Sequence, residues 1–156
     1  MKVLMCGNHP TNKGGMTSVI SLIKNHNWEA ENIEFDFLPT YMPGNKLKTM
    51  LYFAQAYMKV CFRFLTNKPD VFYTHMSYKG SFTRTKALHR LCKMFKIRDI
   101  IHLHGSEFQK WYESCDATKQ SQISNLITDC DSFIVLGEKT GNVLYGLLHL
   151  KPMSGS

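Results

Sequence analysis

Strand-like and helix-like segments alternate five times along the 156-residue chain, and this alternation limits the possible folds more than any other feature. Short apolar or alternating segments predict five strands, at Lys2–Cys6, Ile33–Phe37, Asp70–His75, Asp99–His104 and Ser132–Leu136. Apolar residues at helical spacing predict helices between them, over about Gly15–His26, Asn45–Leu65, Ser81–Lys96 and Ile123–Cys130, with a last helix over Gly137–Leu148.

This alternation predicts a parallel sheet, because parallel strands are joined by crossover helices. We therefore expect an α/β fold, a Rossmann-like doubly wound parallel sheet with strand order 3-2-1-4-5 and helices on both faces. The segment Asp99–His104 should lie inside the sheet. The length fits one domain over residues 1–150, and residues 151–156 are predicted to be a tail.

Basic residues are concentrated in the middle of the chain. Residues 44–98 contain 12 Lys or Arg and a single acid, Asp70, in a chain of net charge +7. Such one-sided charge indicates an anionic partner, either membrane phospholipid, a diphosphate or nucleic acid, although a well-solvated surface would look the same. The predicted long helix of this region also carries one apolar stripe: Leu47, Met50, Leu51, Ala54, Met58, Cys61, Phe62 and Leu65.

Cysteine usage and hydropathy favour a cytoplasmic protein, with peripheral attachment to a membrane as an option. The five cysteines form no Cys-x-x-Cys pair, which is typical of free thiols in a reducing compartment. The apolar start of the chain is too short for a signal peptide. Lys48, Lys59 and Arg63 interrupt the longest apolar run, which argues against a membrane span.

In a doubly wound sheet, ligands bind at the carboxyl ends of the strands, so the segments after the strands are the candidate sites. The loop after the first strand contains Gly14 and Gly15 directly before a helix, where free backbone amides can bind phosphate. This loop has neither the dinucleotide glycine pattern nor a Walker pattern, which disfavours a short-chain oxidoreductase.

Two more strand ends carry polar residues. His102 and His104 lie on one face of the predicted fourth strand, and His104 is nearer the carboxyl edge. A third metal ligand is not apparent nearby in the sequence, so we expect no metal site and assign His104 to polar contact with a substrate. We expect its side chain to face the cleft with little packing. Ser81 and Arg84 begin the helix after the third strand, where a guanidinium suits a phosphate.

Taken in order, these segments resemble the N-terminal domain of family 4 glycosyltransferases of the bacterial exopolysaccharide and capsule type. The resemblance covers most of the chain and rests on Gly14–Ile20, Asp70-Val71 with His75, Ser81–Arg84, His102–Phe108 and Phe133–Glu138. It implies the GT-B arrangement, in which two Rossmann-like domains face each other across a cleft. This chain would be the acceptor-side half, with the C-terminal donor-binding domain absent, and would be inactive alone.

The resemblance also implies roles for particular residues. Gly14 and Gly15 would shape the loop beside the donor diphosphate, and Glu138 is a further donor-binding candidate. His104 would contact the transferred sugar as the catalytic residue. Ser81, Arg84 and Glu107 are the acceptor-binding candidates that go with these roles.

The partners implied are a nucleotide sugar, a lipid-linked or saccharide acceptor, an anionic membrane surface and a separate donor-binding domain, but no nucleic acid. No cofactor and no metal are expected. The alternative hypothesis is a nucleotide- or nucleic-acid-binding Rossmann module without catalysis, which would also account for the basic middle segment.

Overall fold

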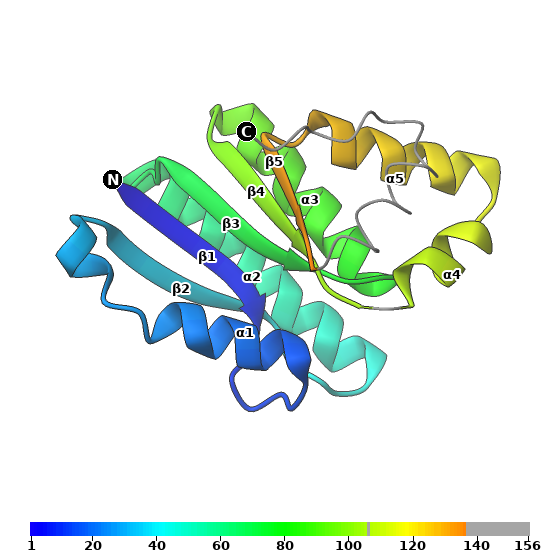
Figure 1. Cartoon of the computed structure of the whole chain (residues 1–156), viewed down its shortest axis with the longest axis horizontal. Coiled ribbons are helices and arrows are strands. Elements are labelled where there is room, and N and C mark those ends of the chain that lie inside the picture. Colours follow the sequence, from blue (N-terminus) through cyan, green and yellow to red (C-terminus); the bar gives the residue numbers. More distant parts are fainter. Residues whose placement is uncertain (106, 137–156) are drawn as a thin grey trace.

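A computed structural model describes residues 1–105 and 107–136 of the chain (Figure 1). The strands are β1 Lys2–Asn8, β2 Glu34–Tyr41, β3 Val71–Met76, β4 Arg98–Leu103 and β5 Ser132–Val135. The helices are α1 Gly15–Lys24, the short 3-10 helix η1 Trp28–Glu31, α2 Lys46–Thr66, α3 Gly80–Phe95, α4 Phe108–Glu113 and α5 Ala117–Asp129. All five strands were predicted from the sequence, whereas η1 and α4 were not. The helix predicted over Gly137–Leu148 lies outside the described residues.

The five strands form one parallel sheet in the order β2-β1-β3-β4-β5, which confirms the predicted fold class and the interior position of β4. The predicted order 3-2-1-4-5 is wrong, because β3 lies at the centre of the sheet and β2 at its edge. The difference follows from burial. Most side chains of β3 are buried, whereas β2 carries the partly exposed acids Glu34 and Asp36, which suit an edge strand.

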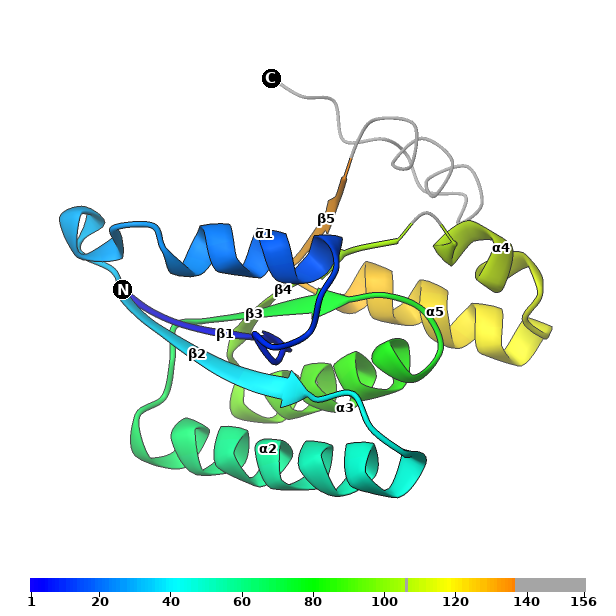
Figure 2. The ribbon, with the colours of Figure 1, turned by 90° about the horizontal axis from the view of Figure 1, so that it is seen from below.

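Helices cover both faces of the sheet (Figure 2). Helix α1 packs on one face, and α2, α3 and α5 pack on the other. The second face holds two apolar clusters, one centred on Phe72 and Val60 between β3 and α2, and one centred on Phe82 and Ile123 between α3 and α5. Because side chains alternate along a strand, the neighbours of Phe72 and Met76 on β3, including His75, face the side of α1.

Helix α2 is apolar on two faces. Its buried residues are Ala56, Val60 and Phe64, which face the sheet. The stripe identified in the sequence lies on the other side, so that Met58 and Phe62 are 66% and 65% exposed. The other large residues of this outer face are also exposed: Leu47, Met50, Leu51 and Leu65. Several large apolar side chains exposed along one helix face indicate an interaction site.

An ion-pair network that is buried at His89 and Asp99 and exposed at Asp129 joins β4, α3 and α5. His89 on α3 lies 2.7 Å from a carboxylate oxygen of Asp99 through Nδ1 and 3.0 Å from one of Asp129 through Nε2. Burial by itself disfavours the imidazolium, but the hydrogen bonds and charges of the two aspartates outweigh it and raise the pKa of His89. Asp99 is almost fully buried, and within the described chain its Oδ1 has no hydrogen-bond partner.

Two further sequence predictions are met by the described residues. None of their helices has both the length and the apolar content needed to cross a membrane. All five cysteines are unpaired, with Cys6 and Cys92 buried, and burial raises the pKa of both thiols.

Candidate functional site

The candidate residues that the structure describes follow the carboxyl ends of β1, β3 and β4, and therefore lie along one edge of the sheet (Figure 1). Chain connections leave β1 and β3 in opposite directions across the sheet, which makes the gap between these two strands the switch point. The sequence analysis placed the first strand next to the fourth. In the structure, β3 separates β1 from β4, and this brings His75 into the site.

The loop between β1 and α1 is open at its glycines. A side chain added at Gly14 or at Gly15 would meet no atom within 4 Å. Gly14 has φ 147°, a conformation that requires glycine, and it is the N-cap of α1 without a side-chain cap. The first turn of α1 contains no acid. The start of α1 therefore has no side-chain cap and no acid in its first turn, and the space beside both glycines is open, as an anion-binding loop requires.

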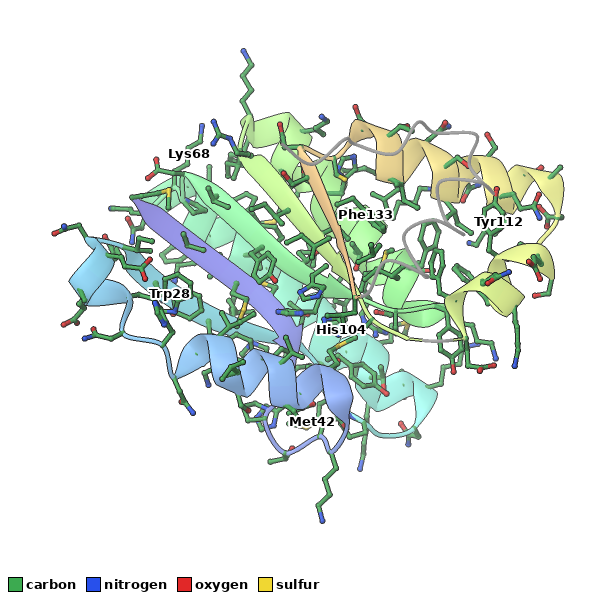
Figure 3. The ribbon with its side chains drawn as sticks, in the orientation of Figure 1. Trp28, Met42, Lys68, His104, Tyr112 and Phe133 are labelled. Atoms are coloured by element: carbon green, nitrogen blue, oxygen red, sulfur yellow. The ribbon has the colours of Figure 1, made fainter. Side chains whose placement is uncertain are left out.

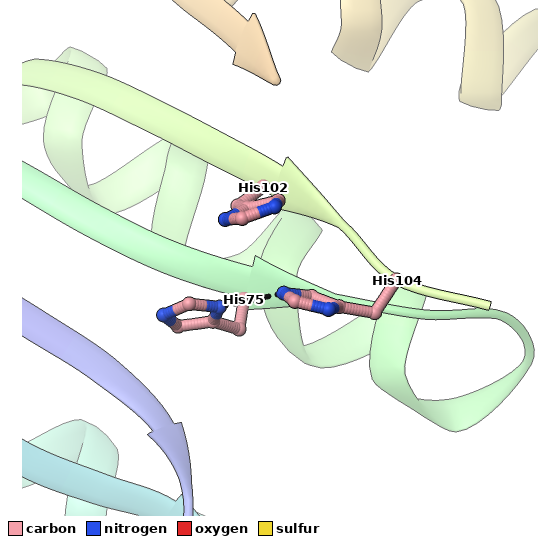
Figure 4. Close-up of side chains that lie close together, drawn as sticks. All are labelled: His75, His102 and His104. Atoms are coloured by element: carbon pink, nitrogen blue, oxygen red, sulfur yellow. Dashed lines mark hydrogen bonds between the residues drawn. The ribbon is translucent and has the colours of Figure 1, made fainter. Parts of the chain in front are cut away.

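Three histidines gather on the α1 side of the sheet, at its carboxyl end: His75 of β3, His102 of β4 and His104, which directly follows β4 (Figure 4). Figure 3 shows the position of His104 in the fold. His75 Nδ1 lies 2.8 Å from His104 Nε2, and the rings of His102 and His104 have centroids 4.2 Å apart. All three are buried. The expectation that His104 has little packing is therefore wrong, because its ring is enclosed by the two other imidazoles. Gly105, with φ 116°, turns the chain immediately after it.

Burial keeps this cluster neutral. It lowers the pKa of His75 to about 3, with further lowering by His104 and His102, and lowers the pKa of His104 to about 4. The pKa of His102 is lowered by the same cause. At neutral pH each ring therefore carries one proton and one free lone pair.

The hydrogen bonds assign the tautomers of two of these rings. His75 Nε2 lies 3.3 Å from the sulfur of Met5, which accepts but cannot donate, so the proton of His75 is on Nε2. His75 Nδ1 must then accept, and His104 donates from its Nε2. The remaining nitrogen of His104, Nδ1, is left with a lone pair for a hydrogen-bond donor.

Ser81 and Arg84 lie around a different part of the carboxyl edge. They line a small cavity of about 10 Å³ together with Tyr41 and His75. Ser81 Oγ accepts a hydrogen bond from the backbone N–H of Ser77 at 3.0 Å, which stabilises the turn into α3. The guanidinium of Arg84 lies 4.4 Å from the ring centroid of Tyr41, and burial lowers its pKa. Arg84 thus packs on an aromatic ring, and it forms no salt bridge with an acid of residues 1–105 or 107–136.

Of the two glutamates in the candidate set, the structure describes only Glu107, which is not part of this cluster. Glu107 is exposed and pairs with Lys110 of the same turn at 3.4 Å. Glu138 lies outside the described residues.

The sequence analysis named His75 without a role and did not single out Tyr73; both residues belong to β3. His75 pairs with His102 in the parallel register of β3 and β4, and the Tyr73 hydroxyl is hydrogen-bonded to His102 Nδ1 at 2.6 Å. The alternation rule was sufficient to place His75 and Tyr73 on one face of their strand. What was missing was the adjacency of β3 and β4, and the register that places His75 opposite His102.

No protein-family model matches the chain, and a search of curated proteins finds none that matches it.

Proposed function

We propose that this chain is the acceptor-side domain of a GT-B type glycosyltransferase that acts at an anionic membrane surface. The overall reaction would transfer a sugar from a nucleotide-sugar donor to a lipid-linked or saccharide acceptor. The observation that carries the proposal is the juxtaposition, at one sheet edge, of an open glycine loop at a helix N-terminus with a buried, neutral histidine cluster. The resemblance of the motifs in these segments to family 4 glycosyltransferases supports the same reading.

The loop at Gly14 and Gly15 suits the diphosphate of a nucleotide sugar. Its amides are uncapped, and the open space beside both glycines leaves room for phosphate oxygens to approach the backbone. Most contacts to the nucleotide would come from the donor-binding domain in this proposal, so the affinity of the chain alone for a nucleotide sugar should be low.

His104 suits contact with the transferred sugar. Its orientation is held by His75, and its Nδ1 lone pair can accept a hydrogen bond from a sugar hydroxyl. Because its pKa is about 4, the ring stays neutral at physiological pH and does not repel the positive charge that develops on a sugar during transfer.

The outer face of α2 suits a membrane. Its apolar residues, among them Met58 and Phe62, would enter the interface between headgroups and acyl chains. Lys48 and Lys59 flank this stripe and are exposed, so they can contact anionic headgroups. Helix α2 begins shortly after the carboxyl end of β2, so its amino-terminal end lies toward the sheet edge that carries the candidate site. A membrane bound to the outer face of α2 would bring a lipid-linked acceptor toward that edge.

A second candidate function rests on a different surface. Lys86 and Arg90 of α3 and Gln122 of α5 line an open groove of about 470 Å³. Burial, together with the neighbouring charges of Arg90 and Lys119, lowers the pKa of Lys86. Cationic side chains close to one another favour a phosphate-bearing partner, which keeps a nucleotide- or nucleic-acid-binding module as the alternative.

The transfer reaction tests the proposal. With a nucleotide sugar and a lipid-linked acceptor in vesicles, the chain alone should transfer no sugar, and adding a donor-binding domain as a separate chain should restore transfer into the lipid fraction. His104→Gln should then lower kcat by roughly tenfold or more, since one hydrogen bond in the transition state is lost. Gly15→Val should instead raise the KM for the nucleotide sugar.

Circular dichroism and thermal unfolding of both variants would show whether they remain folded. Efficient transfer by the chain alone would contradict the proposed division of labour between two domains. Unchanged kcat in folded His104→Gln would remove His104 from the sugar-contacting role.

A further inference from the structure

The histidine cluster has a feature that the proposed function does not use. His75, His102 and His104 come from adjacent strands, and one ring nitrogen of each lies within 4.8 Å of one ring nitrogen of both others (Figure 4). Buried histidines normally satisfy both ring nitrogens. Here His102 is only 6% exposed, and its Nε2 has no hydrogen-bond partner in the described part of the chain. An orphaned lone pair or N–H next to two other imidazoles needs a physical explanation.

The surrounding residues prepare these rings as ligands. Tyr73 holds Nδ1 of His102, and Met5 holds Nε2 of His75. In these two rings the nitrogen away from the cluster is thus occupied by an outer partner. This is the arrangement by which proteins fix the tautomer and orientation of metal-binding histidines, so that the other nitrogen presents its lone pair.

We propose that His75, His102 and His104 together bind one divalent transition-metal ion of the Zn²⁺ class. His75 would ligate through Nδ1 and His102 through Nε2. His104 would ligate through Nε2 once its proton has moved to Nδ1, so that in the metal-bound form Nδ1 would donate a hydrogen bond and in the metal-free form accept one. Three imidazole ligands without a carboxylate suit Zn²⁺, Co²⁺, Ni²⁺ or Cu²⁺ and do not suit Mg²⁺ or Ca²⁺. A set of three leaves a fourth position open, as in zinc sites that bind a water or a substrate.

The geometry agrees with this set of ligands. Tetrahedral zinc with Zn–N bonds of about 2.0–2.1 Å places ligand nitrogens roughly 3.3 Å apart. The His75–His104 pair is closer than this, at 2.8 Å, and the widest spacing in the cluster is within 4.8 Å. Metal binding therefore requires the three rings to turn toward a common point, while the parallel pairing of His75 with His102 holds the backbone in place. The inference concerns binding by this chain alone and does not depend on the proposed transferase activity.

Titration of the chelator-stripped chain with Co²⁺, followed by displacement with Zn²⁺, tests the site. We expect one Co²⁺ per chain and the intense visible absorption of four-coordinate cobalt, which Zn²⁺ should abolish. His75→Gln, His102→Gln and His104→Gln should each remove this absorption and weaken binding by at least about 100-fold. His26→Gln, which changes an exposed histidine, is the matched control and should bind like the unchanged protein.

Tyr73→Phe provides a second variant that leaves all three ligands in place. It removes the hydroxyl that holds His102, and we expect it to weaken metal binding by about 10–100-fold while the cobalt spectrum is retained at saturation. This result would support the site even where a glutamine variant failed to fold.

Several outcomes would overturn the inference. One is the absence of stoichiometric metal binding at micromolar concentrations. Another is undiminished metal binding in folded glutamine variants, and a third is a metal affinity of Tyr73→Phe equal to that of the unchanged protein. Sulfur-to-cobalt absorption in the near ultraviolet would place the metal on the free thiols and would also overturn it.

Discussion

Replacing His89 with leucine should lower the free energy of unfolding by roughly 3–5 kcal/mol, because it leaves the buried carboxylate of Asp99 without its cationic partner. Leucine fills a volume similar to that of histidine, so the loss of free energy reports on the ion pair more than on packing. Urea unfolding measures this free energy, provided that its dependence on urea concentration has the same slope in both proteins. The double variant His89→Leu/Asp99→Leu should recover much of the loss, because a buried ion pair replaced by apolar side chains is often nearly neutral.

An exposed histidine supplies the matched control. His26 and Glu31 form a pair with the same kind of contact, at 2.6 Å, but both side chains are about half exposed. His26→Leu should therefore cost only roughly 0–1 kcal/mol. If His89→Leu cost no more than His26→Leu, the buried network would not stabilise the fold.

The same network predicts that the free energy of unfolding depends on pH. The pKa of His89 is raised in the folded state, so the folded chain holds the proton more tightly than the unfolded chain does. Its contribution is fully present below the ordinary histidine pKa of about 6.5 and is lost as pH rises through the raised value. This decline should be absent in His89→Leu.

The second large effect is expected at the membrane. Met58→Asp/Phe62→Asp should weaken binding to vesicles rich in anionic phospholipid by at least about 100-fold, since each of these side chains contributes about 1.5–3 kcal/mol when fully buried. Lys48→Gln and Lys59→Gln should each cost about 1 kcal/mol at low ionic strength and less in high salt. Vesicle sedimentation over a range of lipid concentrations measures all of these.

Leu22→Asp is the control for the membrane prediction. Leu22 is as exposed as the residues of the α2 outer face but lies on α1, on the opposite face of the sheet, so its change should leave vesicle binding unaltered. Vesicle binding that does not depend on lipid charge would contradict a membrane role. So would vesicle binding by Met58→Asp/Phe62→Asp that equals binding by the unchanged chain. Self-association through α2 without vesicle binding would assign this face to a protein interface instead.

Most of the fold was predictable from local patterns. The five strands and the main helices of the described chain follow from apolar periodicity, which is set by local geometry. The strand order could not be predicted from local patterns, because it depends on which strands are buried on both faces. Two acids in the segment before Pro39 were the available signal that β2 lies at an edge. The short helix α4 has too few turns for a detectable period.

The candidate site was predictable only in part. Positions at strand ends, such as Gly14 and His104, follow from topology alone. The role of His75 depends on the adjacency and register of β3 and β4, a long-range property that no local pattern contains. The sequence pattern of α2 likewise contained an apolar stripe but not the fact that a second apolar face packs on the sheet.

The central claim is that this chain receives a lipid-linked acceptor at a membrane. A comparison of its binding to different surfaces tests this claim most directly. Retention of the chain would be measured at matched salt on three surfaces: anionic vesicles, the same vesicles containing a lipid-diphosphate-linked sugar, and single- or double-stranded nucleic acid. We expect the tightest binding to the vesicles with the lipid-linked sugar, and Arg84→Gln should remove that increment while leaving binding to plain vesicles intact. Equal binding to both vesicle types, or tighter binding to nucleic acid that is lost in Lys86→Gln/Arg90→Gln, would contradict the claim.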